Sequence, residues 1–342
     1  MKKTQWVAAT FLTAFALAAA SGCAGNSAVA PSSTQASTPS DSGSGSGGTA
    51  TLRVAFVAGI TSDPFFRAMQ LGAEDEAQKL GIDLIWTGSP DEYSPESQIP
   101  FVDGALANNI DALILVPTDP DSLQPSVEKA KQQGIPVITV DTTVTDQSYL
   151  TSHITGDNVQ GGQAAAKTLA DQIGGSGQVF IMNGSPTATT NTLREKGFRD
   201  ELAANYPNIT IVGMEYTQSQ PANATSAINT AILKWPDLKG IFAIDGTSGT
   251  GAVAALRNTN TVGKIKLVGY DAYSTEVADL ESGAFSALIA QDPAQEARLA
   301  LQDAKAKVTG VGVSDIQASV VIPNVVMTQD NLSDTKQYQY AD

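Results

Sequence analysis

The segment LRVAFVAGITSD, residues 52–63, is an apolar run of strand length that leads to an aspartate. Three further runs have the same form: Pro136–Val140 before Asp141, Gly240–Ile244 before Asp245, and Lys266–Tyr270 before Asp271. Short continuous apolar runs are typical of parallel strands that are buried on both faces. We therefore expect the four aspartates to meet at the carboxyl ends of strands, where open α/β sheets bind ligands. Buried carboxylates need hydrogen-bond donors, which a polyhydroxylated ligand supplies.

Strands and helices alternate through most of the chain. We expect strands at residues 52–58, 82–86, 112–116, 136–140, 178–182, 209–215, 240–244, 266–269, 285–290 and 320–322. We expect helices at about residues 64–80, 95–107, 121–133, 157–173, 191–205, 221–233, 248–257, 275–282 and 293–307, with a polar tail at the end. Helical connections of this length predict parallel sheets with right-handed crossovers. Because the strands are too many for one sheet, we predict an α/β fold with two doubly wound lobes.

The amino-terminal 50 residues are expected to lie outside the fold. Lys2 and Lys3 precede an apolar stretch that is too short for a permanent membrane span, and small residues then precede Cys23. This arrangement resembles a bacterial lipobox, so we interpret residues 1–22 as a lipoprotein signal peptide and Cys23 as the lipidated residue. The alternative is an ordinary signal peptide with a chance cysteine. Residues 23–50 are rich in Ser, Gly, Thr, Ala and Pro, which predicts a flexible tether.

Composition limits the possible functions. The formal net charge of −15 disfavours nucleic acid and anionic lipid as partners. With one cysteine and one histidine, His153, the chain offers no intrachain disulfide and no conventional metal cluster. We expect a structural role for His153, no cofactor and no metal. A phosphate-binding motif of the form GxxxxGK(S/T) is absent from the sequence, and no nucleophile–base pair stands out.

Several motifs in a fixed order resemble the type I periplasmic sugar-binding proteins of ABC importers, in particular the ribose-binding branch. The resemblance covers about residues 52–325. It rests on VAFVA at 54–58, DPFF at 63–66, LILVPT at 113–118, GIPVITVD at 134–141, SHITGDNV at 152–159, Gly162, REKGF at 194–198, GYD at 269–271 and IAQDP at 289–293.

The resemblance implies two α/β lobes joined by a three-strand hinge, with the chain crossing near Thr155, Gln291 and Val321. The implied amino-terminal lobe comprises residues 51–154 plus 292–321, and the implied carboxyl-terminal lobe comprises residues 155–291 plus 322–342. A ligand between the lobes would be trapped by closure, and the closed form would be recognised by a membrane permease. The family further implies a monomer that is a receptor and not an enzyme.

The resemblance also implies ligand contacts from both lobes. Phe65 and Phe66 match aromatic residues that stack on a sugar face, although Phe66 also fits the apolar core of its helix. Asp63 stands where the family commonly has asparagine, and it can equally cap the helix that starts at Pro64. Thr142 stands where the family often has arginine, which puts ribose in doubt as the ligand. The remaining matches are Asp141 in the first lobe, and Asp245, Asp271 and the hinge glutamine Gln291.

The segment SPTATTNTLR, residues 185–194, has two possible registers against the family's sugar-binding arginine. In one register Thr192 replaces the arginine, and in the other Arg194 retains it. Arg194 can alternatively form a surface ion pair on its helix. Asn191 and Thr190 would face the cleft if this loop resembles that of rhamnose-type and quorum-signal-binding relatives.

We therefore expect a lipid-anchored substrate-binding protein of an ABC transporter, at the cell surface or in the periplasm. Its ligand would be a neutral monosaccharide or a polyol. The alternative is a receptor for another small solute on the same fold, either a quorum signal or a cationic solute that would favour the surplus of acidic groups. A glycosidase could use two cleft carboxylates, but the resemblance is to binding proteins. A sugar-responsive repressor is disfavoured by the export signal and by the lack of a helix-turn-helix before Leu52.

Overall fold

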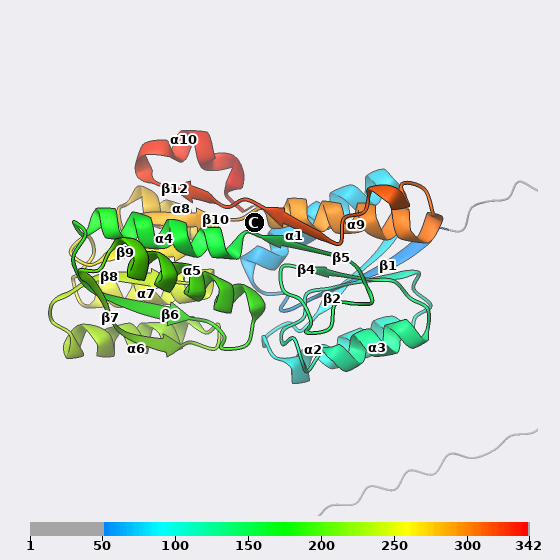
Figure 1. Cartoon of the computed structure of the whole chain (residues 1–342), viewed down its shortest axis with the longest axis horizontal. Helices are drawn as coiled ribbons and strands as arrows, with labels where there is room; N and C mark the ends of the chain where they lie inside the picture. The colour runs from blue at the N-terminus through cyan, green and yellow to red at the C-terminus, as the bar shows by residue number, and fades with distance from the viewer. Residues whose placement is uncertain (1–50, 341–342) are drawn as a thin grey trace, which may run out of the picture. The chain divides into compact units, whose positions relative to one another are not determined.

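The computed structural model describes residues 51–340, which form two six-stranded sheets. The first sheet has the strand order β11-β5-β4-β3-β1-β2, and all its neighbouring strands are parallel. Figure 1 labels β1, β2, β4 and β5 of this sheet. Its strands are β1 (Leu52–Ala58), β2 (Ile82–Gly88), β3 (Ala112–Leu115), β4 (Val137–Val140), β5 (Leu150–Gly156) and β11 (Ser319–Ile322).

The second sheet has the order β12-β10-β9-β8-β6-β7, and only its edge strand β12 runs antiparallel to its neighbour. Its strands are β6 (Gly177–Asn183), β7 (Ile209–Tyr216), β8 (Leu238–Ala243), β9 (Lys266–Tyr270), β10 (Ala287–Ala290) and β12 (Val325–Met327). The prediction of an α/β fold with two sheets is therefore confirmed.

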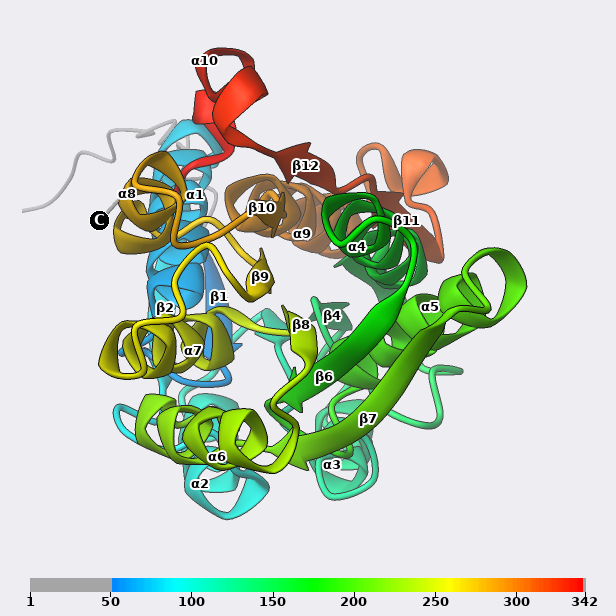
Figure 2. The same ribbon diagram turned by 90° about the vertical axis from the view of Figure 1, so that its left-hand side faces the viewer.

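Both faces of the central strands are buried, which explains why their sequences are continuously apolar. In β6, Val179 and Ile181 pack into one apolar cluster, whereas Phe180 and Met182 pack into the cluster on the opposite face. Figure 2 shows α6 and α7 along one face of this sheet and α4 and α5 along the other. Helices on both faces are what a parallel sheet requires, since its crossovers must cover it.

Most helices begin at a capping residue or a proline. Asp63, Ser94, Asp157, Asp245 and Asp292 each accept a backbone N–H in the first turn of the helix that follows. The helices are α1 (Pro64–Leu80), α2 (Pro95–Leu106), α3 (Gln124–Gln132), α4 (Asn158–Gln172), α5 (Thr189–Asn205), α6 (Pro221–Lys234), α7 (Gly246–Asn258), α8 (Ser274–Glu281), α9 (Pro293–Thr309) and α10 (Leu332–Thr335).

The chain passes between the two sheets three times. β5 leads into α4 and the second sheet, β10 leads into α9, which packs on β3, β4 and β5, and β11 leads into β12. The three passages lie close together at Gly156. A Cβ atom added to this glycine would lie only 3.0 Å from Gln291 Oε1 and 3.1 Å from Asn324 Oδ1. Gly156 therefore allows the three segments to approach closely.

Two features differ from the expected secondary structure. β5 is a full strand that the sequence pattern does not predict, because Ser152 and His153 interrupt its apolar residues. The expected polar tail is instead ordered: β12 pairs with β10, and residues 329–338 form short helical turns around α10. The predicted signal peptide, the predicted tether and Cys23 lie outside the described residues. Within residues 51–340, no helix is long and apolar enough to cross a membrane.

Candidate ligand-binding site

A cavity lies between the carboxyl ends of the two sets of strands. It holds about 510 Å³ of empty space, including the part open to solvent. Nine of the ten residues predicted to bind a ligand line it: Asp63, Phe65, Phe66, Asp141, Asn191, Arg194, Asp245, Asp271 and Gln291. The wall combines aromatic rings with a few polar groups, as small-molecule sites do.

Asp141 and Asp271 adopt the same unusual backbone conformation at equivalent places. Asp141 follows β4 with a φ of 61°, and Asp271 follows β9 with a φ of 75°. Positive φ values are uncommon outside glycine, and aspartate and asparagine tolerate them best. Each sheet therefore ends with a turn that directs a carboxylate into the cavity. Backbone strain of this kind clusters at ligand sites.

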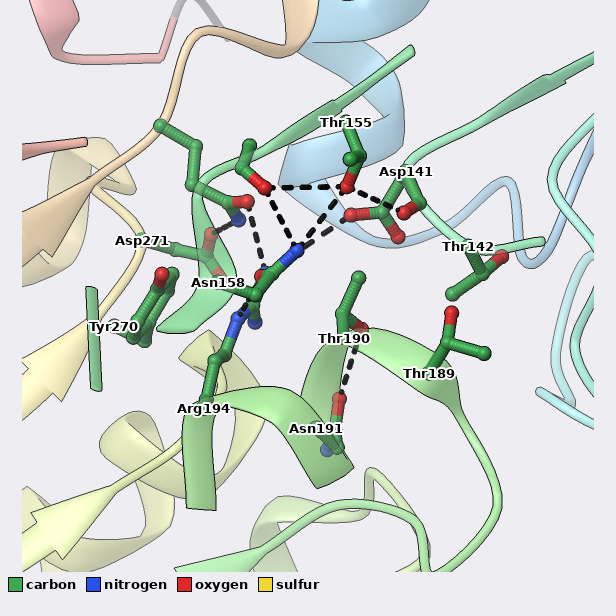
Figure 3. A network of polar contacts seen from close by, with 12 residues as sticks. Asp141, Thr142, Thr155, Asn158, Thr189, Thr190, Asn191, Arg194, Tyr270 and Asp271 are labelled. Carbon is green, nitrogen blue, oxygen red and sulfur yellow. Dashed lines mark hydrogen bonds and ion pairs between the residues drawn. The ribbon is translucent and has the colours of Figure 1, made fainter. Parts of the chain in front are cut away.

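Arg194 is the buried cation of the site, and only 4% of its surface is exposed. Its Nε donates to Asn158 Oδ1 at 2.7 Å, one terminal nitrogen donates to the carbonyl of Ile244 at 3.2 Å, and the other donates to Gln291 Oε1 at 2.8 Å. Its guanidinium lies 3.8 Å from the centre of the Tyr270 ring. Figure 3 labels Arg194 and Tyr270 among the residues of this network. Of the two registers, this arrangement supports the one with Arg194, because Thr192 is exposed and bonds to Thr189 O.

The second-sheet carboxylates are well supplied with donors. Asp271 Oδ1 accepts from Gln291 Nε2 at 2.7 Å and from the Tyr340 hydroxyl at 2.9 Å, and Oδ2 accepts from the Gly246 N–H at 3.0 Å. Asp245 accepts from Thr247 and Ser248, so it caps α7 while it lines the cavity. Asp271 does not cap α8.

Asp141 is less well supplied. Its Oδ1 is buried without a hydrogen-bond partner, and its nearest cation is Arg194, at 3.9 Å. A buried acceptor without a donor is costly. The position of Asp141 is therefore suited to a ligand that brings a donor.

Polar contacts join the two sides of the cavity. The Tyr273 hydroxyl, from the loop after β9, donates to Asp63 Oδ1 at 2.7 Å. The N–H of Thr143, after β4, donates to Thr189 Oγ1 at 3.3 Å. Asp63 also accepts the Phe65 N–H at 2.8 Å, so it is both a helix cap and a site residue. These contacts bring the two sets of strand ends together around the cavity.

The apolar part of the wall comes from aromatic rings. Phe65 and Phe66 are both buried, and their ring centres are 5.2 Å apart in an edge-to-face arrangement. Both line the cavity, and both also belong to the apolar core cluster beside α1. Rings placed this way offer apolar area without requiring hydrogen bonds.

One predicted ligand contact, Thr142, is not part of the cavity wall. Thr142 is buried but does not line the cavity, because its hydroxyl turns away and donates to the carbonyl of Pro117 at 2.7 Å. His153 lies in β5, where its Nδ1 is 3.0 Å from Thr139 Oγ1, and burial lowers its pKa to about 4. This is the arrangement of a neutral structural histidine. Thr190 lines the cavity, as its motif suggested.

Sequence reasoning did not identify several residues of the wall: Ile60, Tyr93, Ser185, Ser219, Thr247 and Tyr273. Tyr273 lies two residues after Asp271, so the strand-end pattern could have included it. Tyr93 lies in the loop between β2 and α2, where no strand or helix pattern of the sequence indicates its position. Only the tertiary structure places it at the cavity.

Burial dominates the electrostatics of the site. It raises the pKa of Asp63 to about 7, against the hydrogen bond from Tyr273, and it raises the pKa of Asp141 to about 7, against the charge of Arg194. Burial also raises the pKa of Asp271, and it raises those of Glu276 and Glu296 well above the usual range. Both carboxyl oxygens of each glutamate lack a hydrogen-bond partner, which favours the neutral acid.

These shifts predict a pH dependence of stability. A carboxyl whose pKa rises on folding stabilises the protein fully below its unfolded value, near 4, and this stabilisation is lost as the pH rises through the folded value, near 7. We expect the melting temperature of the ligand-free protein to fall between about pH 4 and about pH 7. The slope is at most about 1.4 kcal/mol per pH unit for each of Asp63 and Asp141.

The double variant Asp63→Asn, Asp141→Asn is the control, and its melting temperature is expected to fall less steeply. Asp75, Asp119 and Asp146 have lowered pKa values and titrate below this range. A wild-type melting temperature that rises over the same range would contradict the assignment.

The residues described include no group of three or more His, Cys, Asp or Glu side chains that could hold a metal ion. Asp63, Asp245 and Asp271 instead accept hydrogen bonds from backbone N–H groups, hydroxyls and an amide. The arrangement can hold a small polar molecule by hydrogen bonds and by stacking.

The chain is similar in sequence to known binding proteins over most of its length. A family model described as a periplasmic binding protein domain matches residues 54–311. The chain is 28% identical over 269 residues to the ribose import binding protein of Bacillus subtilis, covering 78% of this chain and 84% of that protein. It is 28% identical over 262 residues to the xylitol-binding protein of Mycolicibacterium smegmatis, covering 76% of this chain and 73% of that protein.

A solved structure supports the same relationship. The ABC transporter solute binding protein of Agrobacterium vitis, bound with alpha-D-tagatopyranose, is 33% identical and superposes with a TM-score of 0.82. The match covers 85% of this chain and 100% of that one. The chain therefore belongs to the family of periplasmic binding protein domains, which are receptors and not enzymes.

Proposed function

We propose that this protein is the substrate-binding component of an ABC importer and that it captures a neutral monosaccharide or a polyol in the cavity. The observation that carries the proposal is the buried Asp141 Oδ1, which has no donor of its own and faces a cavity with aromatic walls. A hydroxyl group supplies such a donor without adding charge. The names of the relatives, which include ribose and xylitol binding proteins, support the same ligand class.

The proposed mechanism is a hinge motion of two lobes. The lobes are residues 51–154 plus 292–321 and residues 155–291 plus 322–342, and the three passages near Gly156, Gln291 and Asn324 are the hinge. A ligand that touches Asp141 on one side and Asp271 on the other makes its full set of contacts only when the lobes are closed. Its differential contacts therefore shift the equilibrium toward the closed state.

The setting of the receptor belongs to the same proposal. Residues 1–22 would direct export, Cys23 would carry a lipid anchor, and residues 23–50 would tether the binding domain to the membrane. The closed monomer would then deliver its ligand to a permease. Thr142 remains a proposed contact that would need its hydroxyl to turn from Pro117.

A cationic solute is the second candidate. Asp63, Asp141, Asp245 and Asp271 line a cavity whose wall has Arg194 as its one cationic side chain. A positive ligand would favour the ionised form of these groups. It would, however, have to lie close to the buried guanidinium. We therefore favour the neutral ligand.

A thermal-shift screen of residues 51–342 tests the proposal. The panel contains D-ribose, D-tagatose, D-arabinose and xylitol, together with other hexoses, deoxysugars, quorum signals and small cations. A ligand at a hundred times its dissociation constant is expected to add about 2.7 kcal/mol of stability. Stabilisation by cations alone would favour the second candidate. A folded protein stabilised by none of the sugars or polyols would contradict the first.

A further inference from the structure

The end of the described chain reaches the back of the candidate site. Tyr340 is 4% exposed, and its N–H donates to the carbonyl of Ala272 at 2.9 Å. This bond aligns the tail with the residue that follows Asp271. The tail is also held upstream, where β12 pairs with β10 and Thr328 forms a capping box with Asn331. Tyr340 is therefore placed by a folded segment.

The hydroxyl of Tyr340 acts on a carboxylate of the cavity. It donates to Asp271 Oδ1 at 2.9 Å, next to the 2.7 Å bond from Gln291 Nε2. Tyr340 does not line the cavity, whereas Asp271 does. Its hydroxyl thus holds one oxygen of Asp271 from behind and limits the rotation of the carboxylate.

The ring of Tyr340 contacts both sides of the site. Its centre is 6.0 Å from that of Phe65, at the start of α1, and 5.9 Å from that of Tyr273, after β9. Tyr273 in turn donates to Asp63. Tyr340 therefore lies behind the cavity and contacts one aromatic residue from each side of it, Phe65 and Tyr273.

We propose that Tyr340 is a positioning residue of the binding site, which orients Asp271 through its hydroxyl and joins the two sides of the cavity through its ring. The inference rests on the proposed function, since it assigns a role within the same site. The carboxyl-terminal segment then supports the site from behind, through residues that line the cavity. Loss of the hydroxyl leaves the ring contacts of Tyr340 in place but removes one of the two hydrogen bonds to Asp271 Oδ1.

The test compares Tyr340→Phe and Tyr340→Ala with Tyr338→Phe as the matched control. Tyr338 lies two residues earlier in the same segment and packs against the apolar core. The first readout needs no ligand: the carboxyl carbon of Asp271 is titrated by NMR. Tyr340→Phe removes a hydrogen bond that lowers the pKa of Asp271, so we expect this pKa to rise above its wild-type value. Tyr338→Phe is expected to leave it at the wild-type value.

The second readout is the affinity for whichever of D-ribose, D-tagatose, D-arabinose and xylitol binds the wild type most tightly. We expect a loss of about tenfold in Tyr340→Phe and a larger loss in Tyr340→Ala, with the fold of Tyr340→Phe confirmed by its melting temperature. An unchanged Asp271 titration, or an unchanged affinity in Tyr340→Phe, would overturn the proposal. A wild type that binds no sugar but shows the Asp271 shift in Tyr340→Phe would contradict the proposed function and still support the link between these two residues.

Discussion

Replacement of Arg194 by leucine is expected to lower the free energy of unfolding by about 3–5 kcal/mol, as removal of one partner from a buried charged network does. Three acceptors would lose their donor at once: Asn158 Oδ1, the carbonyl of Ile244 and Gln291 Oε1. Each buried acceptor left unpaired has a desolvation cost. Asp141 and Asp271 would also lose the cation that lowers their pKa values.

The matched control for this prediction is Arg199→Leu on the same helix, α5. Arg199 is partly exposed and pairs with Glu195 four residues earlier. Exposed pairs of this kind contribute about 0–1 kcal/mol, so the control is expected to remain near wild-type stability. Urea unfolding measures both variants. Equal, small losses in Arg194→Leu and Arg199→Leu would contradict the role of Arg194 as the anchor of the site.

Arg194→Lys separates charge from geometry. Lysine keeps the positive charge but cannot present the planar fork that reaches Asn158, Ile244 and Gln291 together. We expect the lysine variant to fold with a stability between those of wild type and Arg194→Leu, and to bind sugar more weakly than wild type. Recovery of full stability in the lysine variant would mean that charge alone accounts for the effect.

The strand ends could be predicted because their signal is local. Asp63, Asp141, Asp245 and Asp271 each stand at or just after an apolar run, and the topology of parallel sheets brings such positions to one edge. The resemblance added Phe65 and Gln291, which the residues alone would not have identified. The same pattern did not reveal that Asp141 and Asp271 have positive φ values, since aspartate is common in ordinary loops as well.

Contacts between distant segments could not be predicted in this way. Tyr340 is 69 residues from Asp271, and Tyr273 is 210 residues from Asp63. The burial of Glu276 and Glu296 could not be predicted either, because a charged residue in a helix is normally expected on the solvent face. Their burial depends on how α8 and α9 pack, which no local pattern describes.

The second large effect is expected at the two carboxylates with positive φ. Asp141→Asn and Asp271→Asn are expected to weaken binding of the best sugar or polyol by about 30-fold or more, since a hydrogen bond to a buried charged group contributes about 2 kcal/mol or more. Asparagine is the appropriate substitution, because it tolerates the left-handed backbone at φ values of 61° and 75°. Alanine at these positions would add a backbone cost to the lost carboxylate.

The effects of the two variants on the ligand-free protein should differ. Asp271 accepts three hydrogen bonds through its two carboxyl oxygens. In Asp271→Asn an NH₂ group replaces one of these oxygens and faces a donor. A moderate loss of stability should therefore accompany the loss of binding. Asp141 Oδ1 has no donor to lose, so Asp141→Asn should retain most of its stability. Asp303→Asn is the control, because this carboxylate is partly buried and bonds to Ser152 away from the cavity. Calorimetric titration that finds wild-type affinity in both site variants, or an equal loss in Asp303→Asn, would show that the ligand does not depend on these two carboxylates.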